Sequence, residues 1–281
     1  MKQEINNPVA LLVHACDRYE LLYKGFEYFF NKYWKDPGGI NYYFATEDIF
    51  TEVKGFKNIR SGKGQWSDRL RCLLESLPED YVLYFQEDMW LSAPVNPAFV
   101  SRLVALARSN NWSLVKLHSA DVYTTIPGPD NIEGFNISQL DNHASRYLMS
   151  HQVSLWRKDF LIAQLKTDEH PWRNERRGTQ RLKKINPHIF HADYFAENGH
   201  MPINENGEMT GRSAYYSISR NASVLPSAKQ FIDDMLSEGG SMEAYARKLQ
   251  HNMVNGLTHD GLPRPKKQDI FKKIKNILRK M

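Results

Sequence analysis

Two adjacent carboxylates, Glu87 and Asp88, stand inside the stretch Tyr81–Leu91, directly after an apolar run. The run is rich in aromatic and β-branched residues, which is typical of a buried strand. Burying a carboxylate costs free energy unless it is paired, hydrogen-bonded or bound to a cation. We therefore expect both acids at the carboxyl end of the strand, where open α/β sheets bind ligands and where acids hold a divalent metal against a phosphate. The alternative is a solvated strand end with ordinary turn acids.

The composition describes an ordinary soluble globular protein. The chain has 281 residues, of which 41% are hydrophobic and 25% are charged, so it can form a large core. No apolar stretch approaches the roughly 18 residues that a membrane span needs, and the start of the chain has no apolar signal region. Cys16 and Cys72 are far apart and form no Cys-x-x-Cys motif. They predict reduced thiols in a cytoplasmic protein and argue against a structural zinc site.

The net charge of +5 is unevenly distributed. The segment Lys266–Met281 has seven Lys or Arg residues against one acid, a balance of +6 that leaves −1 for the rest. A nearly neutral body argues against a nucleic-acid binder. The apolar residues of this tail fall on one helical face, which predicts an amphipathic helix that docks on an anionic membrane surface. The alternatives are a terminal helix packed on the core or a disordered end.

Hydrophobic periodicity and turn signals predict an alternation of strands and helices. Strands are expected at 9–15, 40–45, up to 59, 81–91, 113–117 and 151–156, and helices at 19–34, 67–77, 97–109, 157–165, about three turns from 170, 228–236 and 242–254. The segment Asp121–Asn142 is rich in Pro, Gly, Asn and Asp and is predicted to be a long loop. This order predicts an α/β fold with a mostly parallel sheet covered on both faces.

Three further segments, together with Glu87 and Asp88, resemble the GT-A class of nucleotide-sugar glycosyltransferases over roughly residues 8 to 210. The segments are His14-Ala15-Cys16-Asp17-Arg18, Gln65-Trp66-Ser67-Asp68-Arg69-Leu70, and Ser154–Leu161 followed by His170-Pro171-Trp172-Arg173-Asn174-Glu175. The resemblance implies a Rossmann-like, mostly parallel central sheet flanked by helices, with a C-terminal helical appendage. It implies a GT-A-like catalytic domain at 1–225, C-terminal helices packing on it at 226–260, and the basic amphipathic tail at 261–281.

The resemblance also implies a donor site with a metal ion. The residues expected to contact the nucleotide or donor are His14, Ala15, Asp17, Arg18, Trp66, Asp68, Arg69, Glu87 and Asp88. Asp88, Glu87 and His191 are the expected ligands of Mn²⁺ or Mg²⁺. Gln86 stands where the family has the first acid of its Asp-x-Asp motif, which puts metal dependence in question. Structural alternatives stay open: an N-cap for Asp17, a core position for Trp66, a solvated helix face for Asp68 and Arg69, and a structural role for His191.

An acidic residue at a later helix start serves as the base in inverting members of the class, and Glu175 occupies that place. Inversion requires a carboxylate that takes the proton from the acceptor hydroxyl. Trp172 is expected to stack on a sugar face, with His151 and Arg173 beside the acceptor. The alternative is that Glu175 complements the helix dipole and Trp172 belongs to the core.

These expectations describe an inverting hexosyltransferase. It transfers a hexose from a UDP-sugar to a saccharide, lipid-linked acceptor in bacterial surface polysaccharide synthesis (lipopolysaccharide O-antigen or capsule), and is cytoplasmic and peripheral at the inner face of the cell membrane. One alternative is a nucleotidyltransferase, but the residues after the first strand lack the Gly-rich loop that such an enzyme normally has. The other is a catalytically inactive nucleotide- or carbohydrate-binding protein, which Gln86 keeps open.

Overall fold

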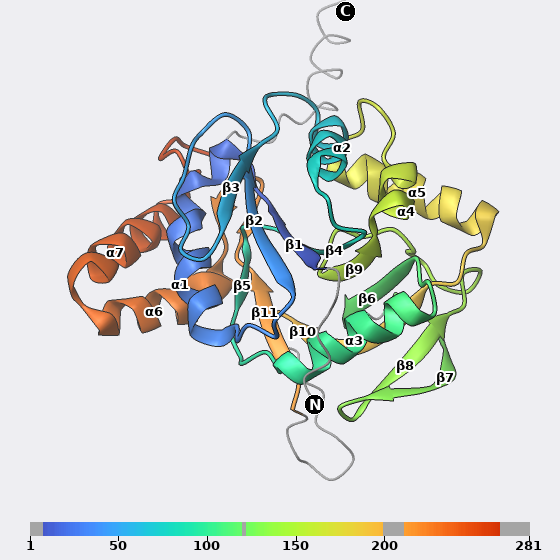
Figure 1. Cartoon of the computed structure of the whole chain (residues 1–281). Coiled ribbons are helices and arrows are strands. Elements are labelled where there is room, and N and C mark those ends of the chain that lie inside the picture. Colours follow the sequence, from blue (N-terminus) through green and yellow to red (C-terminus); the bar gives the residue numbers. More distant parts are fainter. Residues whose placement is uncertain (1–7, 120–121, 199–210, 265–281) are drawn as a thin grey trace, which may run out of the picture. The chain divides into compact units, whose positions relative to one another are not determined.

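The computed structural model describes residues 8–119, 122–198 and 211–264 (Figure 1). The chain divides into two compact units, Met1–Ile218 and Ser219–Met281. The first unit holds the large sheet and the expected site residues. The predicted amphipathic tail, from residue 265 onward, lies outside the described residues.

A large, mostly parallel sheet organises the first unit. Its main path has the order β3-β2-β1-β4-β9-β6-β10-β11-β5. The strands are β1 (Val9–His14), β2 (Ile40–Thr46), β3 (Lys57–Arg60), β4 (Tyr81–Phe85), β5 (Met89–Leu91), β6 (Leu114–His118), β9 (Ser154–Arg157), β10 (Phe190–Glu197) and β11 (Ser213–Ser217). Along this path only β9 and β5 run antiparallel to their neighbours. The expected α/β class with a mostly parallel sheet is therefore confirmed.

Helices cover both faces of this sheet because its strands are apolar on both sides. The helices are α1 (Tyr23–Tyr33), which the 3₁₀ turn η1 (Asp17–Leu22) precedes, α2 (Trp66–Ser76), α3 (Pro97–Ser109), α4 (Lys158–Gln164) and α5 (Pro171–Ile185). Figure 1 shows α2, α4 and α5 grouped together, and their apolar side chains share one core cluster with Leu12, Tyr84 and Trp156 of the sheet. On the opposite face, Phe30 of α1 packs edge-on against Phe85.

A glycine brings α1 close to the sheet. A Cβ atom on Gly25 would lie 2.1 Å from Cη2 of Trp90, which is less than any real carbon contact. Trp90 is fully buried, and its ring also stacks on Phe29 with 5.4 Å between centroids. The helix therefore lies directly on β5, the short strand that follows the two central acids.

The strand predicted at 81–91 is interrupted. β4 ends at Phe85, and the N–H of Met89 donates to the carbonyl oxygen of Gln86 in a tight turn. The chain then continues as β5, which pairs antiparallel with β11 at the far end of the sheet path. Glu87 and Asp88 thus lie in a turn at the carboxyl end of β4, as expected, although the strand does not continue through them.

The prediction of a long loop at Asp121–Asn142 was wrong for most of that segment. The segment forms a hairpin of β7 (Thr125–Ile132) and β8 (Phe135–Leu140), and β8 pairs antiparallel with β10. The prolines of β7 are tolerated because this strand pairs on one side only among the described residues.

The second unit is small and mainly helical. It contains β12 (Ser219–Arg220), β13 (Ser223–Val224), the 3₁₀ turn η2 (Pro226–Ala228), α6 (Lys229–Glu238) and α7 (Gly240–Val254). Both helices predicted here are confirmed, with slightly longer bounds. Within the described residues of the whole chain, we find no helix with the length and apolar character to cross a bilayer.

Candidate active site

One edge of the sheet collects most of the predicted site residues. His14, Phe85, His118 and Glu197 are the last residues of β1, β4, β6 and β10, which run parallel. β9 runs in the opposite direction between β4 and β6, so its preceding residues lie at this same edge. His151 is one of them. The carboxyl edge of an open α/β sheet is where such folds bind ligands.

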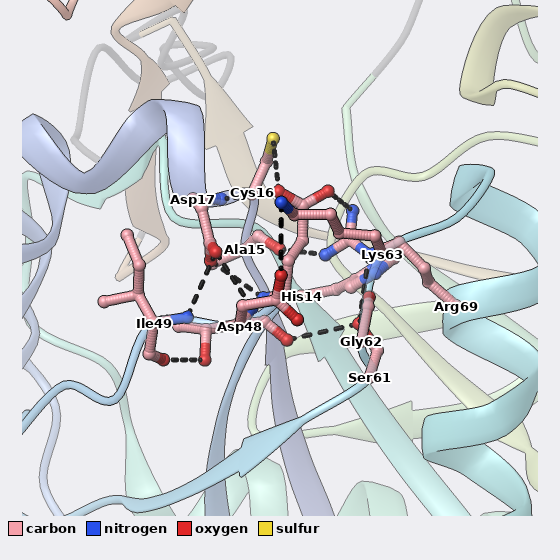
Figure 2. A network of polar contacts seen from close by, with 12 residues as sticks. His14, Ala15, Cys16, Asp17, Asp48, Ile49, Ser61, Gly62, Lys63 and Arg69 are labelled. Atoms are coloured by element: carbon pink, nitrogen blue, oxygen red, sulfur yellow. Dashed lines mark hydrogen bonds and ion pairs between the residues drawn. The ribbon is translucent and has the colours of Figure 1, made fainter.

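Asp17 holds the backbone after β2. Its carboxylate accepts hydrogen bonds from the N–H groups of Glu47, Asp48 and Ile49 at 2.8, 2.9 and 3.1 Å. Figure 2 shows this carboxylate pointing at the Asp48–Ile49 backbone. It does not cap the helix that follows, because the N-cap position belongs to Cys16. Both carboxylate oxygens are used within the protein, so the structure gives Asp17 a positioning role beside the predicted donor site.

Arg69 ties three segments together beneath this edge (Figure 2). Its guanidinium pairs with Glu47 at 2.9 Å and donates to the carbonyl oxygen of Ala15 at 2.7 Å and to Ser61 Oγ at 3.0 Å. The side chain is 6% exposed. Hydrogen bonds from a charged donor are stronger than those between neutral groups, so Arg69 fixes the ends of β1 and β2 relative to α2.

Four aromatic side chains gather beside these ends. The rings of Trp66 and His151 have centroids 4.1 Å apart, and His14 lies 5.8 Å from Trp66. His14 Nδ1 is 3.3 Å from the hydroxyl of Tyr84. Burial lowers the pKa of His14 well below its usual range, with Arg69 and His151 adding to the effect, and burial lowers the pKa of His151 to about 3. Both rings are therefore neutral at pH 7.

The pKa values of Glu87 and Asp88 are both raised, although the charge of Arg69 partly opposes the rise for Glu87. Glu87 is 5% exposed and accepts a hydrogen bond from the N–H of Cys16 at 3.3 Å. Burial raises its pKa, and the neighbouring Asp88 raises it further. Burial also raises the pKa of Asp88, and Glu197 from β10 adds to this. Both carboxyl groups would be stabilised by a nearby cation.

His191 does not join this acidic pair. One of its ring nitrogens, Nε2, lies 2.9 Å from the carbonyl oxygen of His118, which requires that nitrogen to carry a hydrogen. Across the described ranges, no group of three or more His, Cys, Asp or Glu side chains lies close enough to hold a metal ion. The predicted set of Asp88, Glu87 and His191 therefore does not come together as three ligands, because His191 faces the neighbouring strand.

Glu175 lies in the second turn of α5 and points back to the sheet edge. Its Oε1 accepts a hydrogen bond from the N–H of His151 at 3.0 Å. Burial raises its pKa, while the His151 N–H and the Lys116 ammonium oppose that rise. Burial also raises the pKa of Glu197 to about 7, and the charge of Glu175 contributes. Along this edge, the charge of Glu175 therefore raises the pKa of Glu197, and the charge of Glu197 raises the pKa of Asp88.

The remaining predicted residues are exposed or form hydrogen bonds with the segment between α4 and α5. Arg18 is exposed, and Trp172 is 66% exposed in the first turn of α5. Arg173 Nη1 donates to the carbonyl oxygen of Asp168 at 3.4 Å. Asp68 accepts from the N–H of Asp168 at 3.0 Å. The exposure of Trp172 removes the alternative that it belongs to the core.

Sequence reasoning missed three charged residues of this region. They are Glu47, which pairs with Arg69; Glu197, which ends β10; and Lys116, which is fully buried on β6. Lys116 offered a signal, because a lone charge between Val115 and Leu117 interrupts an apolar strand. Nothing in the local pattern marked Glu47 or Glu197.

Comparisons with known proteins give structural neighbours only. No family model and no curated protein sequence matches the chain. Residues 1–349 of S. aureus TarS align with a TM-score of 0.46 at 11% identity, covering 88% of this chain and 71% of that chain. The complex of the same residues with UDP-GlcNAc aligns with a TM-score of 0.44 at 12% identity, covering 88% of this chain and 72% of that chain. The CMP-2-keto-3-deoxy-manno-octonic acid synthetase complexed with CTP aligns with a TM-score of 0.40 at 14% identity, covering 66% of this chain and 89% of that chain. All three TM-scores are below 0.5, so the likeness carries no conclusion about activity, and the fold class rests on the strand order.

Proposed function

We propose that this chain is a nucleotide-sugar glycosyltransferase of the GT-A type, with Glu175 as its general base. The observation that carries the proposal is the position of Glu175. Its carboxylate is oriented by the His151 N–H at the carboxyl edge of the sheet, in electrostatic contact with Glu197, which acts in turn on Asp88. A base needs an oriented carboxyl group with a pKa closer to neutrality than usual, and burial provides this for Glu175.

The proposed reaction inverts the anomeric carbon of a hexose. Glu175 takes the proton from an acceptor hydroxyl, the acceptor oxygen forms a bond to the anomeric carbon, and the bond from that carbon to the diphosphate oxygen breaks. Trp172, exposed beside Glu175, offers a ring face for the acceptor sugar. The aromatic group of Trp66, His151 and His14 lies beside the end of β1, where the base of a nucleotide would bind.

Glu87 and Asp88 fit one mode of divalent metal binding. Mg²⁺ is commonly held by one or two carboxylates together with substrate phosphates and water, without a full set of protein ligands. Burial raises the pKa of both acids, and a bound divalent cation would favour their ionised forms. Bound Mn²⁺ or Mg²⁺ would neutralise the charge of the leaving diphosphate. The proposal therefore keeps Glu87 and Asp88 as metal ligands and removes His191.

The first experiment is calorimetric titration of the full chain with UDP, with and without Mn²⁺, and with GDP and CDP as controls. We expect UDP binding that Mn²⁺ strengthens by at least tenfold and that Asp88→Asn reduces to the metal-free value. UDP binding without a metal effect would overturn the metal assignment and leave Arg and Lys to neutralise the phosphates. No binding of any nucleotide would contradict the glycosyltransferase proposal and favour a protein without this activity.

The setting of the reaction is proposed from the sequence of the tail, which lies outside the described residues. We propose that it binds the anionic inner face of a bacterial membrane, where the acceptor is a lipid-linked saccharide of a surface polysaccharide. Each basic residue near such a surface adds about 1 kcal/mol. Deleting Pro265–Met281 should abolish sedimentation with vesicles that contain anionic lipid and leave the thermal melting unchanged. A truncated chain that still sediments would contradict membrane binding by the tail.

A further inference from the structure

A buried lysine lies beneath the proposed base. Lys116 is the central residue of β6 and is fully buried. The sheet register places it between Ser154 of β9 and His191 of β10. Removing an ammonium group from water is costly unless contacts compensate for the lost hydration. The contacts of Lys116 therefore show what stabilises it.

Lys116 and Glu175 are anchored to consecutive residues. Lys116 Nζ donates to Ser150 Oγ at 2.8 Å, and the N–H of His151 donates to Glu175 Oε1 at 3.0 Å. Lys116 Nζ also lies 5.4 Å from the centre of the Tyr123 ring, where a cation is attracted by the ring face. The ammonium group of Lys116 and the carboxylate of Glu175 are thus bound by two adjacent residues of the short segment before β9.

Besides Tyr123, whose pKa burial raises, three neutral histidines surround Lys116. They are His118 on the same strand, His151 before β9 and His191 on β10, and burial lowers the pKa of each ring below its usual value. Glu175 on α5 is the acid whose charge acts on Lys116, and it opposes the lowering of the lysine pKa, to about 7, that burial causes. The charge of Glu175 in turn contributes to the raised pKa of Glu197 on β10.

We propose that Lys116 is a positioning residue that holds the Glu175 side chain in its ionised, hydrogen-bonded state from a buried place behind Ser150 and His151. Its burial keeps it away from substrate, so it acts through Glu175 alone. Burial favours protonation of Glu175, and Lys116 is the cation that opposes it. This inference rests on the proposed base role of Glu175.

The test measures the pKa of Glu175 in Lys116→Met, a change that removes the charge and keeps most of the volume. Carboxyl ¹³C signals of the full chain, labelled at glutamate, would be followed against pH, with Glu175→Gln to assign the signal. We expect the pKa of Glu175 to rise by about one unit. The acid limb of the pH profile of kcat should move by the same amount while the KM for the donor stays the same. Lys116→Arg, which keeps the cation, should restore the parent pKa at least in part.

Ser150→Ala provides a second route that keeps the charge and removes its anchor, and a smaller rise in the same direction is expected. A pKa of Glu175 that stays at the parent value in every folded variant of this set would overturn the inference. The NMR measurement does not require turnover. An inactive parent would therefore contradict the proposed function, whereas an unshifted pKa would contradict the role of Lys116.

Discussion

Glu175→Gln should lower kcat by about 10²- to 10⁴-fold, the usual contribution of a general base. Glutamine keeps the size of the side chain and its acceptor oxygen for the His151 N–H, which lies 3.0 Å from Oε1. It cannot take a proton. Because the change leaves the end of β1 intact, the Kd for UDP should stay within about twofold of the parent value, and single-turnover kinetics with a UDP-hexose would show the loss in the chemical step.

The pH profile of the parent chain's proposed activity gives the same test in another form. Burial raises the pKa of Glu175, so the ionised base is lost at a higher pH than the value of about 4.3 for an exposed glutamate. The rate should therefore fall as pH decreases through that raised pKa and stay high above it. Glu75→Gln, an exposed acid on α2, is the matched control and should leave kcat unchanged. Equal turnover in Glu175→Gln would rule out the base role.

Arg69→Met should lower the free energy of unfolding by about 3–5 kcal/mol, the usual cost of removing one partner of a buried ion pair. The substitution removes three contacts together: Glu47 loses its cation, and the carbonyl oxygen of Ala15 and Ser61 Oγ lose their hydrogen bonds from the guanidinium. Denaturant unfolding of the full chain, followed by circular dichroism, measures the loss. UDP binding should weaken as well, because the ends of β1 and β2 lose their link to α2.

The control for Arg69 is an exposed pair in the same unit. Arg102 is 68% exposed and lies 2.7 Å from Glu133, and exposed pairs contribute about 0–1 kcal/mol. Arg102→Met should therefore change stability by less than about 1 kcal/mol. If Arg69→Met costs no more than Arg102→Met, the buried network does not stabilise this edge of the sheet.

Elements with a strong apolar pattern could be predicted from the sequence. The strand at Val9–His14 is apolar up to its last residue, and the helix at Pro97–Ser109 has Asn96 as its cap and Pro at its first position. In such segments local preference and burial favour the same structure, so one sequence suffices. The order of these elements was also enough to predict the sheet class.

Elements that depend on distant partners could not be predicted. Pro127, Gly128 and Pro129 indicate a loop locally, yet β7 forms because β8 pairs with β10, about 50 residues further along the chain. The break after Phe85 likewise depends on the pairing of β5 with β11. Long-range pairing outweighs local propensity in both places.

Some of the candidate site residues could be predicted from their local position, and others could not. Glu87, Asp88 and Glu175 follow from position relative to a strand or a helix start. The roles of Asp17 and Arg69 as internal anchors depend on Glu47 and Asp48 after β2 and on Ser61 after β3, in loops with no pattern of their own. No spacing rule could bring those loop residues to the end of β1.

The placement of β9 has a consequence for the cooperativity of the molecule. In the main path of the sheet, as far as the chain is described, β9 alone joins the half with β1 and β4 to the half with β6 and β10. His14, Glu87 and Asp88 belong to one half, and Lys116 and Glu197 to the other. A strand of four residues thus joins the two halves within the sheet. Local opening of β9 would loosen this join, whereas the pairing of β5 with β11 and the hydrogen bond from the Ile218 N–H to the Asp88 carbonyl oxygen would still hold the turn of Glu87 and Asp88 to the second half.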